Sequence, residues 1–83
     1  MRVLYFAWVK EKAGIAAEEI DPPAEVATIA ELINWLKARG PEFANAFARS
    51  EVIRAAIDQS HVRHDARIKG AREIAFFPPV TGG

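Results

Sequence analysis

Residues 28–41 read Thr-Ile-Ala-Glu-Leu-Ile-Asn-Trp-Leu-Lys-Ala-Arg-Gly-Pro, and this stretch predicts the main helix of the chain. Thr28 and Glu31 have the spacing of a capping box, in which each side chain accepts a hydrogen bond from the other residue's backbone N–H. Apolar residues then recur at helical spacing: Ile29, Leu32, Ile33 and Leu36. Gly40 suits a left-handed residue beyond a helix end, and Pro41 forbids continuation. We therefore expect one amphipathic helix with a single apolar stripe.

Two strands are expected before this helix. Arg2–Lys10 is rich in β-branched and aromatic residues and predicts the first strand, and Glu18–Ile20 predicts a short second one after a turn or helical turn at Lys10–Gly14. The odd positions of the first strand carry no charge, and we place them in the core: Val3, Tyr5, Ala7 and Val9. The even positions are placed toward solvent: Leu4, Phe6 and Trp8. A strand buried on both faces is the alternative.

The chain after the main helix predicts a shorter helix and two more strands. Pro41–Ala48 is the helix, Val52–Asp58 the third strand and Glu73–Phe77 the last strand. In the third strand we place three residues inward, Ile53, Ala55 and Ile57, and three outward, Arg54, Ala56 and Asp58. In the last strand Ile74 and Phe76 point inward, and Phe77 points outward.

This order of elements, with one main helix, predicts an α+β fold of the ubiquitin-like β-grasp type: a mixed sheet with the helix packed on one face. The first two strands form a hairpin, and the main helix crosses to bring a later strand beside the first. The other face of the sheet then stays uncovered. Phe6, Trp8 and Phe77 are expected to form an apolar patch there, and exposed aromatic residues suggest a partner surface.

The composition excludes several classes of function. Eleven basic residues balance eleven acidic ones, which argues against binding to nucleic acid or to a membrane surface. The chain has no cysteine, so a disulfide, a thiolate metal site and a nucleophilic side-chain sulfur are all excluded. No apolar run approaches the ~20 residues of a membrane span and no signal peptide is visible, so we expect a cytoplasmic protein.

Two histidines could suggest a metal site, but we do not favour that interpretation. His61 and His64 lie three residues apart with Asp65 adjacent, in a segment after Gln59 that reads as a loop. Two imidazoles and a carboxylate on a loop are weak grounds for a metal centre, and we interpret both histidines as solvated. We predict no metal.

The chain ends in Phe-Phe-Pro-Pro-Val-Thr-Gly-Gly, residues 76–83. Pro78 and Pro79 lack backbone N–H groups and fix φ, so they cannot continue a sheet. We therefore expect one domain over residues 1–77 and an extended tail over residues 78–83, which reaches on the order of 20 Å. Glycine lets a backbone pass through a channel too narrow for a β-carbon. A frayed terminus is the alternative, but it would not need the stiffness of Pro-Pro.

Residues 73–83 resemble the ending of the MoaD family of sulfur carriers, the small subunits of molybdopterin synthase. Val3–Ala7 and Ala55–Gln59 also match the pattern of that family, and the order of elements agrees from end to end. A Gly-Gly ending alone is shared by many ubiquitin-like proteins. The aromatic pair followed by Pro-Pro and Val-Thr-Gly-Gly is much more specific.

The resemblance implies a sulfur carrier in the biosynthesis of molybdopterin, the organic part of the molybdenum cofactor. An E1-like adenylylating enzyme would use ATP to activate Gly83 as an acyl-adenylate, and a sulfur donor, a sulfurtransferase or desulfurase, would convert it to a thiocarboxylate. The tail would then enter the active site of the synthase large subunit and give sulfur to the pterin precursor, cyclic pyranopterin monophosphate. The inserted residues would be Pro78, Pro79, Val80, Thr81, Gly82 and Gly83. The chain would hold no cofactor stably and no catalytic residue of its own, so it would be the sulfur-donating subunit of a sulfurtransferase complex.

The resemblance also implies a partner interface. Phe6 and Phe77 match positions of the hydrophobic surface that docks the large subunit and the adenylylating enzyme, and Trp8 is placed beside them. His61 falls in the same surface, where the family tends to have an aliphatic residue. Two further departures are Asp58, in place of the more usual asparagine, and Arg72, in a turn that is usually acidic.

Two alternative functions stay open at this point. The first is a sulfur carrier for another product, such as the thiazole of thiamine, or a protein modifier related to ubiquitin. The second is a non-catalytic interaction domain whose aromatic residues bind a partner and whose tail is inert. An independent enzyme is not favoured, because the sequence has no cysteine, glycine-rich phosphate loop or clustered acid–base pair.

Overall fold

The computed structural model describes residues 1–79, which form a mixed five-stranded sheet and its helical cover. The elements in chain order are β1 (Arg2–Tyr5), α1 (Ala7–Ala13), β2 (Ala17–Glu19), α2 (Ile29–Lys37), α3 (Pro41–Ala46), the 3₁₀ helix η1 (Ser50–Val52), β3 (Arg54–Ile57), β4 (Ser60–Val62) and β5 (Glu73–Phe77). No helix in this described part is long and apolar enough to cross a membrane.

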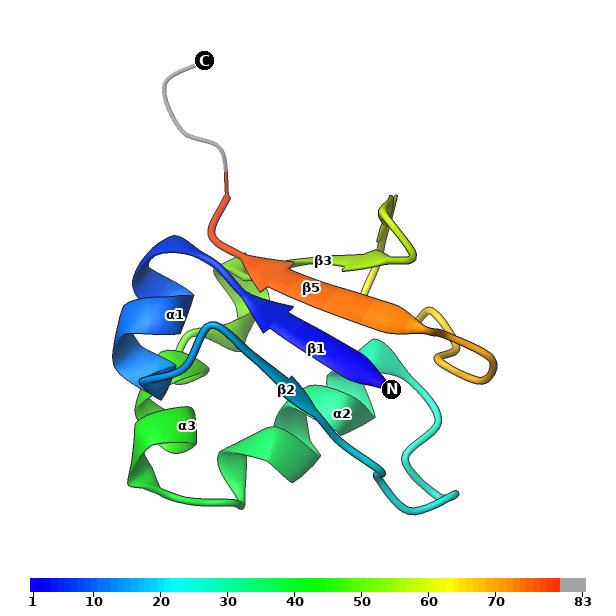
Figure 1. The fold of residues 1–83 in the computed structure, drawn as a ribbon, viewed down its shortest axis with the longest axis horizontal. Coiled ribbons are helices and arrows are strands. Elements are labelled where there is room, and N and C mark those ends of the chain that lie inside the picture. Colours follow the sequence, from blue (N-terminus) through cyan, green and yellow to red (C-terminus); the bar gives the residue numbers. More distant parts are fainter. Residues whose placement is uncertain (80–83) are drawn as a thin grey trace.

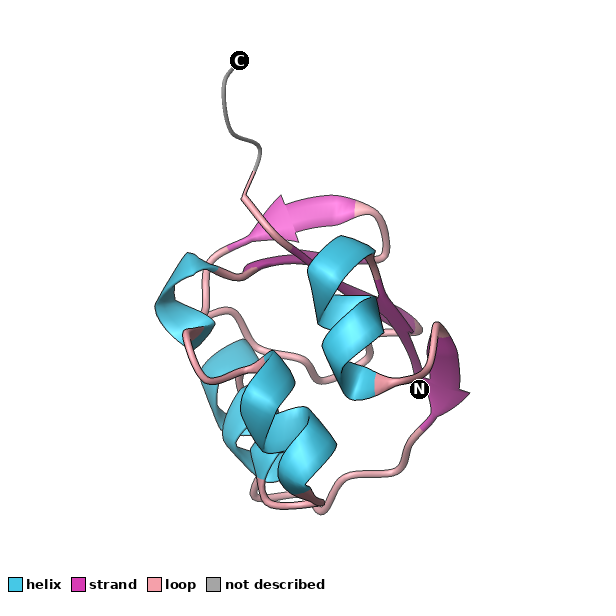
Figure 2. Ribbon diagram, turned by 90° about the vertical axis from the view of Figure 1, so that its left-hand side faces the viewer, coloured by secondary structure: helices cyan, strands magenta, loops and turns pink. Residues whose placement is uncertain are grey.

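The last strand, β5, lies in the middle of the sheet, whose order is β2-β1-β5-β3-β4. It runs parallel to β1 and antiparallel to β3, and β1 pairs antiparallel with β2. β1 and β2 pass in front of the helical layer in Figure 1, and the helices lie together on one side of the strands in Figure 2. The predicted α+β fold, with its helical layer on one face and a late strand beside the first, is confirmed.

The core fills the space between the sheet and the helices. Alternate residues of β1 and β5 meet the apolar stripe of α2 there: Val3, Tyr5, Ile74, Phe76, Ile29, Leu32, Ile33 and Leu36. The buried ring of Phe47 lies 5.1 Å from the Phe76 ring and 6.3 Å from the Tyr5 ring, centroid to centroid. Since strand side chains alternate, the residues between these core positions face the opposite side of the sheet.

The capping box of α2 forms as the sequence predicts. The Glu31 N–H donates to the Thr28 hydroxyl at 3.2 Å, and the Glu31 carboxylate accepts from the Thr28 N–H at 3.1 Å. The expectation for Gly40 is wrong, because this residue does not end α2 in a left-handed conformation. Its backbone is extended, with φ 165°, and it precedes Pro41 as the N-cap of α3.

The first strand is shorter than predicted, because β1 ends at Tyr5 and α1 begins at Ala7. Ala7 has a left-handed φ of 53°, which turns the chain out of the sheet. Val9 and Ala13, one helical turn apart, are buried, and Gly14 ends the helix with φ 86°. Val9 is therefore a core residue as expected, but on a helix, whereas Ala7 is exposed and not in the core.

The strand β4 is not predicted from the sequence, because its three residues carry little strand signal. Residues 60–62 pair antiparallel with β3 across a two-residue turn, so His61 lies in a strand and not in a loop. Asp58 and Gln59 form that turn with φ values of 48° and 72°, the signs required by a type I′ hairpin. The third strand itself begins two residues later than predicted, after η1. Ala56, placed outward, lies on the outer face but is 6% exposed.

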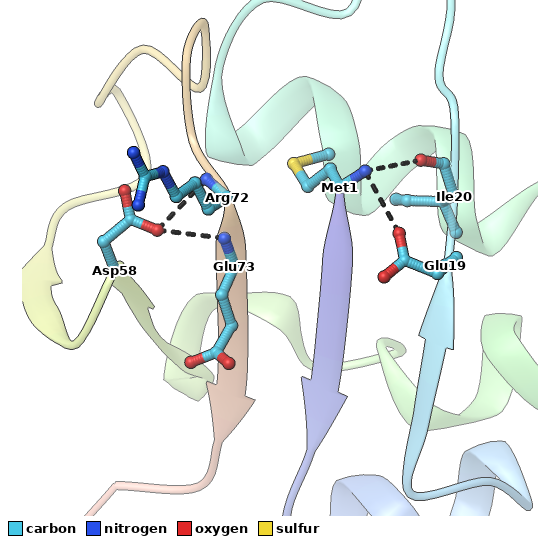
Figure 3. A network of polar contacts seen from close by, with 6 residues as sticks. All are labelled: Met1, Glu19, Ile20, Asp58, Arg72 and Glu73. Carbon is cyan, nitrogen blue, oxygen red and sulfur yellow. Dashed lines mark hydrogen bonds and ion pairs between the residues drawn. The ribbon is translucent and has the colours of Figure 1, made fainter.

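Polar contacts fix the starts of β1 and β5, which lie at the same end of the sheet (Figure 3). One oxygen of the Asp58 carboxylate accepts hydrogen bonds from the backbone N–H groups of Arg72, at 3.0 Å, and Glu73, at 2.9 Å. The Met1 amino group donates to the Ile20 carbonyl at 3.2 Å and lies 3.4 Å from the Glu19 carboxylate. The β3–β4 turn is thereby tied to the start of β5, and β1 to the end of β2.

A third polar cluster joins the helical layer to the sheet. Arg39, beyond the end of α2, donates two parallel hydrogen bonds to the Glu18 carboxylate on β2, at 2.8 and 2.9 Å. The Tyr5 hydroxyl of β1 donates to the same carboxylate at 2.7 Å. The bonds from Arg39, and then that from Tyr5, hold the pKa of Glu18 below its usual value, whereas burial raises the pKa of the Tyr5 hydroxyl.

Candidate docking surface and C-terminal segment

The face of the sheet that turns away from the helices is the candidate site, and we call it the outer face. The registers place Leu4 of β1 opposite Ala75 of β5, Ala75 opposite Ala56 of β3, and Ala56 opposite His61 of β4. Paired residues in adjacent strands point to the same side of a sheet. These four therefore form one row across the outer face, made of small and apolar side chains with one imidazole at its end.

Phe77 and Phe6 extend this row toward the end of the sheet where β5 finishes. Phe77 pairs with Arg54, and its ring centroid lies 5.2 Å from that of His61. The Phe6 N–H donates to the Phe76 carbonyl at 3.1 Å, so Phe6 continues the parallel register beside the end of β5. Phe6 is 47% exposed, one of the two large apolar side chains recorded as exposed among residues 1–79. An exposed aromatic next to a half-buried one is typical of an interface centre.

The structure places two of the three predicted aromatic residues together, and not the third. Trp8 lies on α1, not in the sheet, so the expected patch of Phe6, Trp8 and Phe77 in neighbouring strands is wrong for Trp8. Its ring is covered by the Lys12 ammonium at 5.2 Å and borders a separate hollow of about 420 Å³ between α1, α3 and η1. A role for Trp8 in docking stays a prediction.

His61 lies on the outer face, the surface to which the family resemblance assigns it. Its side chain is exposed, as predicted for a solvated residue, yet its ring packs against Phe77 and joins the outer face. His64 is half-buried, and its Nε2 lies 2.8 Å from the Ile53 carbonyl oxygen, so it is not the freely solvated loop residue we expected. Among residues 1–79 no three His, Cys, Asp or Glu side chains are grouped in a way that could hold a metal ion. Val62 is the one apolar residue of β4, so the sequence carries little signal that His61 lies in a strand.

The chain leaves the sheet at the end of β5, whose last residue is Phe77 (Figure 1). Phe6 lies beside this end, because its N–H donates to the Phe76 carbonyl. Pro78 and Pro79 follow directly, half-buried and outside the sheet, as expected for residues without a backbone donor. The predicted tail residues Val80, Thr81, Gly82 and Gly83 lie outside the described residues. The described part thus presents an apolar face at the root of a segment that begins with two prolines.

The shifted pKa values in the described part have structural causes. Those of Tyr5, Glu18 and Arg39 arise from one cluster on the helix-facing side of the sheet. The pKa of Glu31 is lowered by the backbone N–H of Ala27 and by the α2 cap. None of these groups lies on the outer face.

A mixed sheet with helices on one face, and an apolar face at the root of a C-terminal extension, define a ubiquitin-like β-grasp protein. Two solved structures share the fold. SAMP1 from Haloferax volcanii has a TM-score of 0.72 at 22% identity, covering 100% of this chain and 98% of its own. A Pyrococcus furiosus protein assigned as molybdopterin converting factor, subunit 1, has a TM-score of 0.73 at 28% identity, covering 95% of each chain.

The chain belongs to the ThiS family, whose profile matches residues 3–83. It is 36% identical to the molybdopterin synthase sulfur carrier subunit of Escherichia coli (strain K12), over 100% of this chain and 99% of that protein. It is 37% identical to the protein of the same name from Dictyostelium discoideum, over 99% of this chain and 94% of that protein. The resemblance to this class of sulfur carriers, inferred from residues 73–83, is confirmed.

Proposed function

We propose that this chain is the sulfur carrier subunit of a molybdopterin synthase, and that Gly83 carries the sulfur as a C-terminal thiocarboxylate. The observation that carries the proposal is the position of β5. This central strand ends beside exposed Phe6 and half-buried Phe77 and runs straight into Pro78 and Pro79. Such a layout lets a partner bind the outer face while the tail extends past it. The matches to named sulfur carrier subunits over the whole chain support the same reaction.

The chemistry explains why the tail ends in glycine. A carboxylate is a poor electrophile, so its oxygen first attacks the α-phosphorus of ATP and pyrophosphate leaves. Sulfide, HS⁻, then attacks the acyl carbon of the adenylate, and AMP leaves with the carbonyl carbon now bound to sulfur. Where the sulfur arrives as a donor's persulfide, the attack gives an acyl disulfide, and a thiol reductant cleaves its S–S bond to release the thiocarboxylate. The thiocarboxylate is anionic at neutral pH and keeps a nucleophilic, polarisable sulfur. Glycine at positions 82 and 83 leaves the backbone narrow enough to enter a partner's active site.

The proposal assigns the catalytic groups to the partners. The large subunit supplies the active site in which sulfur passes to the pterin precursor, and a second charged copy of the carrier supplies the second sulfur of the dithiolene. An E1-like enzyme supplies the adenylylating site with ATP, and a sulfurtransferase or desulfurase supplies the sulfur. The carrier's own part is to dock through Phe6, Phe77 and the outer face, and to present Pro78 to Gly83. Since activation consumes ATP, we place the reaction in the cytoplasm.

Intact-mass analysis tests the proposal. The chain is incubated with ATP, the adenylylating enzyme of the same organism and a sulfur donor, and we expect one oxygen of Gly83 to be replaced by sulfur. A variant that lacks Gly83 is the matched control, and it should fold and bind the large subunit without gaining sulfur. Unchanged mass of the full chain with an active adenylylating enzyme would count against the carrier role.

Adding the large subunit and the pterin precursor then tests the product. We expect molybdopterin, with the carrier returned to its carboxylate form. Formation of thiazole, or of a conjugate between Gly83 and another protein, would replace this assignment by another carrier pathway or by a modifier. Tight binding of the large subunit with no sulfur transfer would support the interaction-domain alternative.

A further inference from the structure

The outer face has a basic corner beside the end of β5. Arg54 at the start of β3 pairs with Phe77, and His61 on β4 packs against the Phe77 ring. Arg63 lies one residue beyond the end of β4. Arg54 and Arg63 both border two adjacent hollows, one of about 220 Å³ that also includes His61 and one of about 190 Å³. We call Arg54, His61 and Arg63 the basic rim.

The rim has donors that the described chain does not use. The ion pairs found within residues 1–79 involve Arg39, Arg49 and the Met1 amino group, and neither Arg54 nor Arg63. Glu51 borders the second hollow, but its carboxylate lies 3.6 Å from the Arg49 Nε. Arg54, His61 and Arg63 are all exposed. Two guanidinium groups and an imidazole therefore lie close together at this corner, with N–H donors that a partner can reach.

The charge of this corner differs from the net charge of the whole chain. The chain carries eleven basic and eleven acidic residues, so its net charge is zero while this corner is basic. The corner is also continuous with the apolar row through Phe77. An apolar centre with a polar, charged border is the usual anatomy of a protein–protein interface, and arginine is enriched there. Three donors beside aromatic rings suit a protein partner better than the long phosphate backbone of a nucleic acid, which needs an extended basic face.

We propose that the basic rim recognises carboxylates on the partner that docks on the outer face, so that this partner carries Asp or Glu side chains next to its apolar contact. The inference rests on the proposed function, because it takes the partner to be the large subunit of the synthase. Arginine binds a carboxylate through two parallel hydrogen bonds, which fixes orientation as well as charge. The rim thereby sets which large subunit this carrier accepts, while Phe6 and Phe77 supply the apolar contact common to any partner.

Calorimetric titration of the large subunit of the same organism tests the rim. The double variant Arg54→Gln/Arg63→Gln should bind about tenfold more weakly than the unaltered chain at ~50 mM salt, with the difference shrinking to less than about threefold at ~500 mM. The matched control is Arg67→Gln/Lys69→Gln, which removes the same charge from two exposed residues outside the rim, and its affinity should change less than about twofold.

Cross-linking then tests for the partner carboxylates directly. The variant Arg54→Lys/Arg63→Lys keeps the charge and adds amines that a carbodiimide couples to a nearby carboxylate. We expect peptide mapping to find links from positions 54 or 63 to Asp or Glu of the large subunit. Links that form only from the native lysines would contradict the rim, as would equal weakening by the rim variant and its control.

The outcomes separate the two proposals. If the unaltered chain does not bind the large subunit, the proposed function fails and the assignment of the rim's partner fails with it. If it binds with an affinity that neither salt nor the Arg54→Gln/Arg63→Gln change alters, the rim alone is overturned. Binding of a labelled single-stranded oligonucleotide that is lost in the rim variant would also overturn it, in favour of a nucleic acid.

Discussion

Replacing Glu18 with alanine should destabilise the domain by about 2 kcal/mol. The change removes the two bonds from Arg39, and exposed ion pairs of this kind contribute up to about 1 kcal/mol. It also leaves the hydroxyl of Tyr5, a residue that is 1% exposed, without its acceptor, which costs about 1–3 kcal/mol. For a chain of 83 residues each kcal/mol corresponds to roughly 4–8 °C, so the melting temperature should fall by roughly 8–16 °C.

Thermal and urea unfolding followed by circular dichroism measure this change. Glu19→Ala is the matched control: the neighbouring carboxylate is 73% exposed and pairs only with the Met1 amino group among its described contacts, so its loss should cost less than about 0.5 kcal/mol. In a Tyr5→Phe background Glu18→Ala should cost about 1 kcal/mol less, because no hydroxyl is left unpaired. Equal losses for Glu18→Ala and Glu19→Ala would refute the reasoning. Affinity for the large subunit, measured well below the melting temperature, should not change.

The same cluster predicts a pH dependence. Hydrogen bonds from Arg39 lower the pKa of Glu18 in the folded chain relative to the unfolded chain, where a glutamate titrates near about 4.3. Its contribution is thus fully present above that pH and is lost as the pH falls through the lower, folded value. The difference in melting temperature between the unaltered chain and Glu18→Ala should therefore shrink below about pH 4. A constant difference down to pH 2 would show that ionisation of Glu18 is not involved.

Three further substitutions probe the outer face and the turns. Phe77→Ala should weaken binding of the large subunit by about 2 kcal/mol or more, roughly thirtyfold in a calorimetric titration, whereas Phe43→Ala, the same change at a half-buried residue of α3 in the helical layer, should leave it unchanged. Asp58→Asn should cost less than about 0.5 kcal/mol in urea unfolding, because an amide oxygen still accepts from both backbone N–H groups, whereas Asp58→Ala should cost about 1–2 kcal/mol. Ala7→Gly should stabilise the domain by up to about 1 kcal/mol in the same assay, since glycine adopts the positive φ without strain, and a loss of stability would show that Ala7 is not strained.

Local sequence patterns were sufficient to predict α2 and β5. The Thr28–Glu31 box and the apolar stripe that follows are short-range features, so they predict a helix without knowledge of its surroundings. Alternation in residues 73–77, closed by two prolines, predicts a strand in the same way. The likeness of the chain's ending to known sulfur carriers likewise depends on consecutive residues, which is why family and function were accessible before the fold.

Local sequence patterns did not predict α1 and β4. Val3 to Val9 has high β-propensity throughout, and propensity cannot show that Ala7 leaves the sheet with a positive φ so that Val9 packs into the core from a helix. Packing against α3 stabilises the helical conformation of α1, and these two segments lie about 30 residues apart along the chain. For this reason Trp8, predicted on the outer face, lies elsewhere.

The docking surface was likewise predicted only in part from the sequence. Phe6, Phe77 and the prolines were predicted from neighbouring residues, because strand alternation and the missing N–H of proline act locally. The packing of His61 against Phe77, with Arg54 and Arg63 nearby, depends on a hairpin register and on the pairing of β3 with β5, between which residues 58–72 intervene. Register arises from the packing of the whole sheet against its core, so the tertiary structure alone brings the basic rim to the root of the tail.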